Sequence, residues 1–317
     1  MNHKISKRSL RPIAVILVIV SLFGLSCKKS NEESKTIYET VAADPNYSFL
    51  TAAITKAGLV NALNDDKKEG LTLFAPSNDA FMAAGFNSVA DLAKIPDSTL
   101  TKILLYHVLG TKVPAAQIPQ ASNSEVLTLN TQPIYATRTS DNNVFINGVS
   151  VVKADIECTN GVIHNINRVL LPATGTIVQT AINNPDLSLL VAAVLRASQG
   201  STDVATVLSG SGPFTVFAPT NQAFINAGFP DVNAINAADP NTLTSILTYH
   251  VIAGRIFSSD LTDGPTPATL NGGTVAISLS GAAHVKGNSN STAATITVTD
   301  IIATNGVVHV IDQVLLP

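Results

Sequence analysis

The sequence predicts an α+β protein built of two tandem domains, and three observations support this prediction. Long blocks of residues occur twice in the same order. Apolar residues recur at helical spacing in the first part of each copy, and strand-like segments joined by Asn-Gly turns occupy the later part. Each domain is therefore expected to run from helices into a β-meander.

The duplication is clearest in two blocks. Leu71–Phe81 returns as Phe214–Phe224, and Asp155–His164 returns as Asp300–His309. Each copy is long enough to bury its own core, and the period is too long for a solenoid of short repeats. The predicted boundaries are a signal peptide at 1–26, a tether at 27–35, domains at 36–172 and 176–317, and a linker at 173–175.

Helix signals open each copy. Segments 48–58 and 188–197 begin at serine, a good N-cap, and carry apolar residues at helical spacing. The Asp-Pro pair at 239–240 predicts a capped helix start, followed by an apolar stripe that reaches His250. The same stripe reaches His107 in the first copy.

A strand-to-helix corner comes next in each copy. Segments 71–75 and 214–218 are expected to be short strands that end at proline, after which Ser77 or Thr220 caps a helix. The later part of each copy reads as strands. Asn-Gly in segment 144–152 predicts a hairpin, and Thr-Asn-Gly predicts two more. These Thr-Asn-Gly turns lie at 159–161 and 304–306.

The N-terminus predicts export. Basic residues precede an apolar run at 13–25 that is shorter than a membrane span, which is typical of a signal peptide. Ser26 and Cys27 follow this run and resemble a bacterial lipoprotein processing site, in which Cys27 is lipidated. The alternatives are ordinary cleavage and an uncleaved anchor. We expect a bacterial cell-envelope protein, held by a lipid in the outer membrane or at the cell surface.

Composition limits the partners. Without residues 1–26 the chain keeps 15 Lys and Arg against 22 Asp and Glu, a formal charge near −7, which disfavours nucleic acid. The sequence has no Trp and few aromatic residues, so stacked sugar-binding platforms would depend on five Tyr and eleven Phe. The low charge fits an extracellular domain with polar, uncharged loops.

The repeated blocks resemble the two signature blocks and the central Tyr-His motif of the fasciclin (FAS1) adhesion domain. The resemblance covers about residues 36–317 and implies two wedge-shaped β-sandwiches decorated by helices, extracellular placement and adhesion without catalysis. It also implies a partner-binding role for four residues of the Tyr-His motifs. These are Tyr106, His107, Tyr249 and His250. The first copy departs from the pattern, because Asn167 replaces the carboxylate kept at Asp312.

The residues with chemical potential each have a structural interpretation. The apolar stripes predict that His107 and His250 are buried neutral imidazoles, hydrogen-bonded to the backbone or a nearby polar group. His164 and His309 follow turns and are expected to be structural too. The sequence predicts no metal site, because no histidine pair has short ligand spacing.

The remaining candidates are a cysteine and two carboxylates. Cys158 aligns with Ala303, which predicts a small apolar core position and not a catalytic thiol. Asp155 and Asp300 are expected to brace the backbone. The sequence also lacks nucleophile-elbow, phosphate-loop and zinc-protease motifs.

The prediction is therefore a non-enzymatic adhesion lipoprotein without cofactors or catalytic residues. It is expected to contact the membrane through its lipid and an unidentified protein or glycan ligand in a matrix or on neighbouring cells. The alternative is a polysaccharide-binding or polysaccharide-processing envelope lipoprotein.

Overall fold

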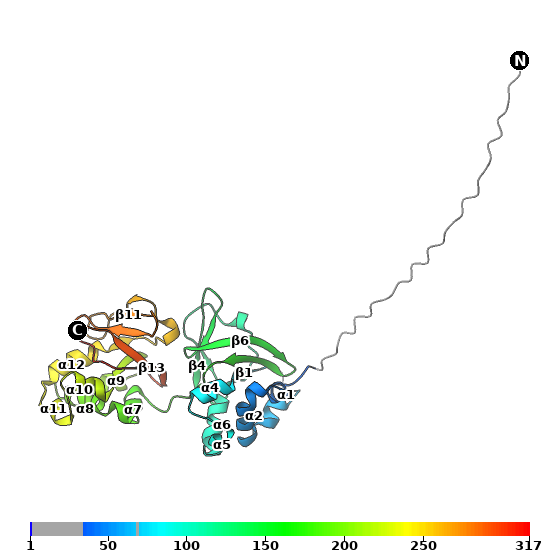
Figure 1. Ribbon diagram of the computed structural model, residues 1–317, viewed down its shortest axis with the longest axis horizontal. Coiled ribbons are helices and arrows are strands. Elements are labelled where there is room, and N and C mark those ends of the chain that lie inside the picture. The colour runs from blue at the N-terminus through cyan, green and yellow to red at the C-terminus, as the bar shows by residue number, and fades with distance from the viewer. Residues whose placement is uncertain (2–33, 68–69) are drawn as a thin grey trace. The chain divides into compact units, whose positions relative to one another are not determined.

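The computed structural model describes residue 1, residues 34–67 and residues 70–317 (Figure 1). Ser34–Pro317 form one compact unit. The predicted signal peptide, Cys27 and most of the tether lie outside the described residues. Residues 36–172 are called the first repeat below, and residues 176–317 the second repeat.

Both repeats contain helices followed by strands. The first repeat has the helices α1 Ile37–Ala43, α2 Ser48–Lys56, α3 Val60–Asn64, α4 Asn78–Ala83, α5 Val89–Leu92 and α6 Asp97–Tyr106, and the 3-10 helices η1 Pro45–Tyr47 and η2 Ala115–Gln117. Its strands are β1 Leu71–Pro76, β2 Val108–Leu109, β3 Ser124–Leu127, β4 Pro133–Arg138, β5 Val144–Ile146, β6 Val149–Cys158 and β7 Gly161–Ile166.

The second repeat follows the same plan. Its helices are α7 Ile177–Ile182, α8 Ser188–Ala197, α9 Val204–Ser209, α10 Asn221–Asn226, α11 Val232–Ala237 and α12 Pro240–Tyr249, with the 3-10 helices η3 Pro185–Leu187 and η4 Ser258–Asp260. Its strands are β8 Phe214–Pro219, β9 Val251–Ala253, β10 Gly264–Pro265, β11 Ala276–Ser278, β12 His284–Lys286, β13 Ala294–Ala303 and β14 Gly306–Ile311. In each repeat the helices gather on one side of the strands (Figure 1).

The strands of each repeat form a seven-stranded sheet, which confirms the α+β prediction. The orders are β2-β1-β7-β6-β5-β4-β3 and β10-β11-β12-β13-β14-β8-β9. The predicted meander is incomplete, because β1 pairs in parallel with β7 and β8 pairs in parallel with β14. Two parallel strands need a long connection between them, so no short-range sequence pattern predicts their pairing. Here residues 77–160 lie between β1 and β7, and residues 220–305 lie between β8 and β14, which is more than half of each repeat.

The parallel strands separate two cores. All six residues of β1 are buried, as in a strand covered on both faces. Leu73 joins the helix-side core, whereas its neighbour Phe74 joins a second core among the strands, because successive side chains point to opposite faces. The second core also takes Ile134 from β4 and Ile146 from β5, so the sheet folds over on itself around it.

The long strands β6 and β13 turn the sheet. Each pairs with β7 or β14 through register shifts of the kind that β-bulges produce. Asp155 and Asp300 lie in these irregular stretches with φ of 56° and 64°. Aspartate tolerates this left-handed conformation better than most residues, which suits it to a bulge position.

The prediction that Ser48 and Ser188 cap their helices is wrong. The serines are the first helical residues, and neither helix has a side-chain cap hydrogen bond from its N-cap residue. Instead, Asn78 of α4 accepts from the backbone N–H of Phe49 at 3.0 Å. Asn221 of α10 does the same for Leu189 at 2.9 Å. Each helix start is therefore held by a residue distant in sequence.

The strand-to-helix corners and hairpins are confirmed with one shift. Ser77 and Thr220 accept from backbone N–H groups of their helices, as predicted. Asn147 and Gly148 form the β5–β6 turn with φ of 50° and 76°. In the Thr-Asn-Gly turns, however, glycine is already the first residue of β7 or β14. Along the described chain, no helix combines the length and the apolar character that crossing a bilayer requires.

Candidate functional site

The Tyr-His motifs lie inside the repeats. Tyr106 and Tyr249 end α6 and α12 with 0 % exposure, and His107 and His250 follow with 1 % and 2 %. The Tyr106 hydroxyl donates to the carbonyl of Pro133 at 2.9 Å and accepts from the Asn147 amide at 3.0 Å. Burial raises the pKa of Tyr106 to about 12.

Hydrogen bonds define the state of the two histidines. Nε2 of His107 accepts from the backbone N–H of Leu170 at 2.9 Å, so this nitrogen carries no proton. Nδ1 therefore carries the proton and donates to the carbonyl of Ile103 at 2.8 Å. His250 repeats both bonds, to Leu315 N and Ile246 O, each at 2.8 Å.

Burial keeps both imidazoles neutral. Desolvation lowers the pKa of His107 and of His250 to about 4, although a backbone hydrogen bond opposes this shift. Each ring ties the end of a helix to the segment after the last strand. The expectation of buried, neutral, hydrogen-bonded histidines is confirmed. Any partner contact in this region would be made by the residues that cover these side chains.

The second histidine of each repeat braces the bulge. Nε2 of His164 donates to the carbonyl of Val113 at 2.9 Å, and Nδ1 accepts from the backbone N–H of Asp155 at 3.2 Å. His309 does the same with Ile256 O and Asp300 N. Desolvation is the main cause that lowers the pKa of both rings. The bulge backbone of each repeat is thereby held by a histidine of the adjacent strand.

The aspartates of the bulges brace backbone, as expected, but in different surroundings. Asp155 is exposed and accepts from the backbone N–H of Ala115 at 2.8 Å. The Asp300 side chain is 2 % exposed and accepts from the backbone N–H of Ser258 at 2.6 Å. Equivalent carboxylates thus lie on an open surface in one repeat and in a covered one in the other.

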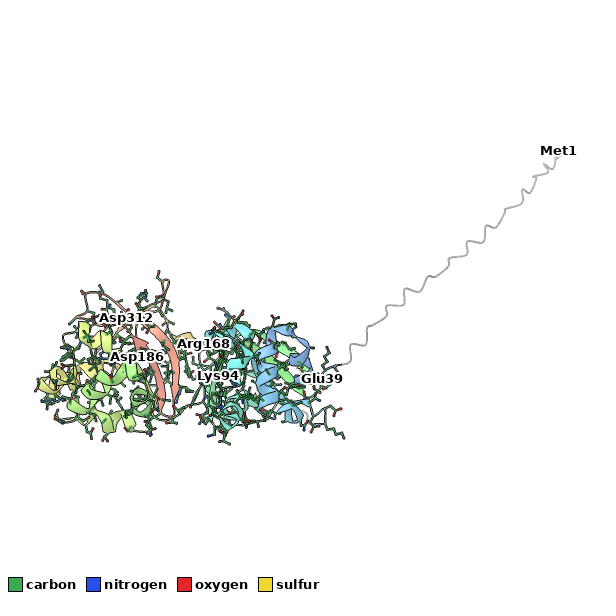
Figure 2. The ribbon with its side chains drawn as sticks, turned by 60° about the horizontal axis from the view of Figure 1, so that its bottom comes forward. Met1, Glu39, Lys94, Arg168, Asp186 and Asp312 are labelled. Atoms are coloured by element: carbon green, nitrogen blue, oxygen red, sulfur yellow. The ribbon has the colours of Figure 1, made fainter. Side chains whose placement is uncertain are left out.

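The cover over Asp300 comes from the first repeat. The Arg168 guanidinium, labelled in Figure 2, lies 2.6 Å from the Asp300 carboxylate and donates to the Thr299 hydroxyl at 3.2 Å. Nearby, the Arg255 guanidinium lies 4.1 Å from the ring centroid of Tyr135, close enough for a cation–π contact. An ion pair and a stacking contact therefore link side chains of the two repeats within the compact unit.

Two buried asparagines were read from the sequence only as turn residues. Asn160 accepts from the backbone N–H of Ile37 at 2.8 Å and donates to the carbonyl of Leu63 at 2.9 Å. Asn305 accepts from Ile177 N at 2.9 Å and donates to the carbonyls of Leu208 and Gly210. The Thr-Asn-Gly repeat was the available signal, because a turn alone does not require asparagine in both copies.

The described side chains offer few groups for chemistry. Cys158 is 8 % exposed and lies 3.4 Å from the Thr40 hydroxyl, and burial raises the pKa of its thiol. Among the residues that the structure describes, no group of three or more His, Cys, Asp or Glu could hold a metal ion. Three tyrosines are buried, and Tyr38 and Tyr135 are half-buried. The exposed aromatic platform that sugar stacking would favour does not arise from these tyrosines.

The fold and the repeated internal hydrogen bonds define a tandem pair of one α+β domain type. The model described as "Fasciclin domain" matches residues 45–172 and again residues 186–317, so the chain belongs to the fasciclin family. The resemblance of the repeated blocks to the fasciclin domain is thereby confirmed.

The relatives are found in animals and bacteria. The chain is 29 % identical over 247 residues to transforming growth factor-beta-induced protein ig-h3 of Sus scrofa, covering 78 % of this chain and 34 % of that protein. Protein sll1483 of Synechocystis is 40 % identical over 145 residues, covering 45 % of this chain and 77 % of its own. This chain thus spans about a third of the ig-h3 protein. A solved FAS1 domain pair from the insect cell adhesion molecule fasciclin I aligns over 85 % of this chain and 96 % of its own, with 20 % identity and a TM-score of 0.41.

Proposed function

We propose that this protein is a non-enzymatic adhesion lipoprotein of the bacterial envelope that contacts a matrix or neighbouring cells through two fasciclin domains. The observation that carries the proposal is the use of the repeated polar side chains. The Tyr-His pairs, the bulge histidines and the turn asparagines all bind backbone groups inside their own repeat. What the two copies share is therefore a scaffold, and binding is left to surfaces that differ.

The segments that supply those differences contain β3 and β4 in the first repeat and β10, β11 and β12 in the second, joined by largely exposed turns. Residues 119–143 of the first repeat and 262–292 of the second differ in length and composition. Two similar scaffolds with different segments of this kind suit two weak contacts in one chain, because the first contact makes the second effectively intramolecular. The resemblance of the Tyr-His region to partner-binding regions would then concern the surface above these buried side chains.

A solid-phase assay tests the proposal. The purified protein is applied to arrays of matrix proteins and glycans, beside variants in which the exposed turn 140–143 of the first repeat or the exposed turn 279–282 of the second is replaced by a Gly-Ser segment of equal length. We expect saturable binding to at least one ligand and a loss in each turn variant of at least tenfold. Turnover of a polysaccharide or ester by the wild-type protein would contradict the proposal and favour the polysaccharide-processing alternative.

The lipid anchor is tested separately. Cys27 directly follows an apolar run and Ser26, so it is proposed as the lipidated residue. Labelled fatty acid should enter the wild-type protein and be absent from Cys27→Ser, whereas Cys158→Ser should keep the label because Cys158 is buried. Label retained in Cys27→Ser would overturn the anchor.

A further inference from the structure

The second repeat contains an apolar cavity of about 90 Å³. It lies among α7, α8, α9 and α12 and reaches the strand residue Val216. The lining is aliphatic apart from Phe217 and His250. Ile182 and Leu195 belong to the lining and are also 59 % and 60 % exposed, so the cavity opens to the surface between α7 and α8.

The corresponding region of the first repeat is nearly full. The cavity there measures about 20 Å³, little more than the roughly 10–15 Å³ that one water molecule requires. Several of its walls are the equivalents of the walls in the second repeat. Ile54, Leu63, Leu73, Leu104 and Val108 correspond to Val194, Leu208, Val216, Leu247 and Val251.

Substitutions in the first helix explain the difference in volume. Val178 and Ala181 of α7 line the large cavity, and the equivalent residues of α1 are Tyr38 and Val41. Val41 is fully buried and Tyr38 packs against the helix-side core of the first repeat. Two larger side chains thus occupy in the first repeat the space that stays open in the second.

The residues at the mouth of the cavity also differ between the two repeats. The exposed Ile182 and Leu195 of the second repeat correspond to Ala42 and Thr55 in the first. Ile182 and Leu195 therefore place exposed apolar side chains at the mouth of an open apolar cavity, where they could contact an apolar ligand that enters it. Compared with the first repeat, the second repeat therefore has smaller side chains inside the cavity and larger apolar side chains at its mouth. The cavity is called the chamber below.

The chamber accepts hydrocarbon and excludes polar groups. Both ring nitrogens of His250 are already bonded to the backbone, so this residue has no partner to offer a ligand. A peptide backbone would bring N–H and C=O groups that stay unpaired there at a large cost. An apolar cavity of about 150 Å³ in another protein stays dry and binds benzene, so this smaller cavity of about 90 Å³ suits the narrow end of an alkyl chain better than a ring.

We propose that this cavity binds the methyl end of a single-chain amphiphile such as a fatty acid, with the polar head left outside Ile182 and Leu195. The probe is dodecanoate below its micelle concentration, added to the intact protein with labelled Ile, Leu and Val methyl groups. Saturable NMR shifts are expected at Val178, Ile182 and Leu195. The equivalent positions around Val41 should not respond.

Exchanging residues between the repeats gives the sharpest variant. Val178→Tyr with Ala181→Val introduces the first repeat's side chains and should weaken dodecanoate binding at least tenfold without lowering the melting temperature. If this double variant does not fold, Ala181→Val alone should weaken binding severalfold. Ile182→Ala should also weaken binding severalfold. Its matched control is Ile225→Ala, because Ile225 is 43 % exposed and lies outside the lining.

Three results would overturn the proposal. One is a folded, cavity-filled variant that binds dodecanoate as well as the wild type does. Another is equal weakening by Ile182→Ala and Ile225→Ala, which would indicate adsorption to any exposed apolar side chain. The third is a cavity that takes up xenon, or an amphipathic helical peptide, while dodecanoate fails to saturate it.

Discussion

At the scale of single residues, the buried histidines of both repeats form hydrogen bonds with backbone groups. Each imidazole of the Tyr-His motifs satisfies one buried N–H and one carbonyl, a donor and an acceptor that only the neutral ring can serve together. The sequence predicted burial from the apolar stripe. It could not identify the partners, because Leu170 and Leu315 lie far along the chain from the rings that they contact.

Loss of one such ring should destabilise its repeat. In His250→Ala the backbone N–H of Leu315 stays buried without an acceptor, at a cost of about 1–3 kcal/mol. Urea denaturation followed by circular dichroism measures the change. The control is His284→Ala, because His284 is only half-buried and bonds the carbonyl of Ala282 two residues away. Unchanged stability of His250→Ala with lost ligand binding would assign the ring to function.

The same histidines predict acid sensitivity. The pKa of His107 and of His250 is about 4 when folded, below the ordinary value of 6.5, so the unfolded chain binds more protons in between. Their stabilisation is therefore complete above pH 6.5 and is lost as the pH falls towards 4, by about 3 kcal/mol for each ring. Urea midpoints should fall steadily from pH 7 to pH 4.5. A flat profile over that range would contradict the neutral buried state.

At the scale of elements, local signals were sufficient where the contacts are local. The corner caps at Ser77 and Thr220 and the Asn147-Gly148 turn were predictable, because each depends on neighbours within a few residues. The sequence did not predict the parallel pairing of β1 with β7 or the capping of α2 by Asn78. Both depend on how distant segments pack, which periodicity does not encode.

The turn asparagines connect the elements. Asn305→Ala should remove bonds from the β13–β14 turn to the start of α7 and the end of α9, leaving buried groups unpaired at a cost of about 1–3 kcal/mol. Amide hydrogen exchange at Ile177 should accelerate more than exchange in α12. Asn226→Ala is the control, since Asn226 is exposed and bonds Gln222 within its own helix. Equal effects of the two substitutions would refute this role.

At the scale of the whole molecule, an ion pair couples the repeats. Arg168→Ala would leave the nearly covered Asp300 carboxylate with Ser258 as its remaining partner, and should lower the free energy of unfolding by about 1–3 kcal/mol. Lys94→Ala is the control, because it breaks an ion pair of which the lysine is 77 % exposed. If Arg168→Ala and Lys94→Ala lower the free energy of unfolding equally, the ion pair between the repeats contributes no more to stability than an exposed ion pair does.

The contact between Arg168 and Asp300 also has a consequence for assembly. It joins unlike surfaces of two equivalent domains, and such a heterologous contact would extend into a filament if every domain carried both halves. Asp155 presents the acidic half on an exposed surface of the first repeat, but Gln313 occupies the position that matches Arg168 in the second. Gln313 carries no charge and cannot form the same ion pair with Asp155 of another chain, so among the described residues this contact runs in one direction, from the first repeat to the second.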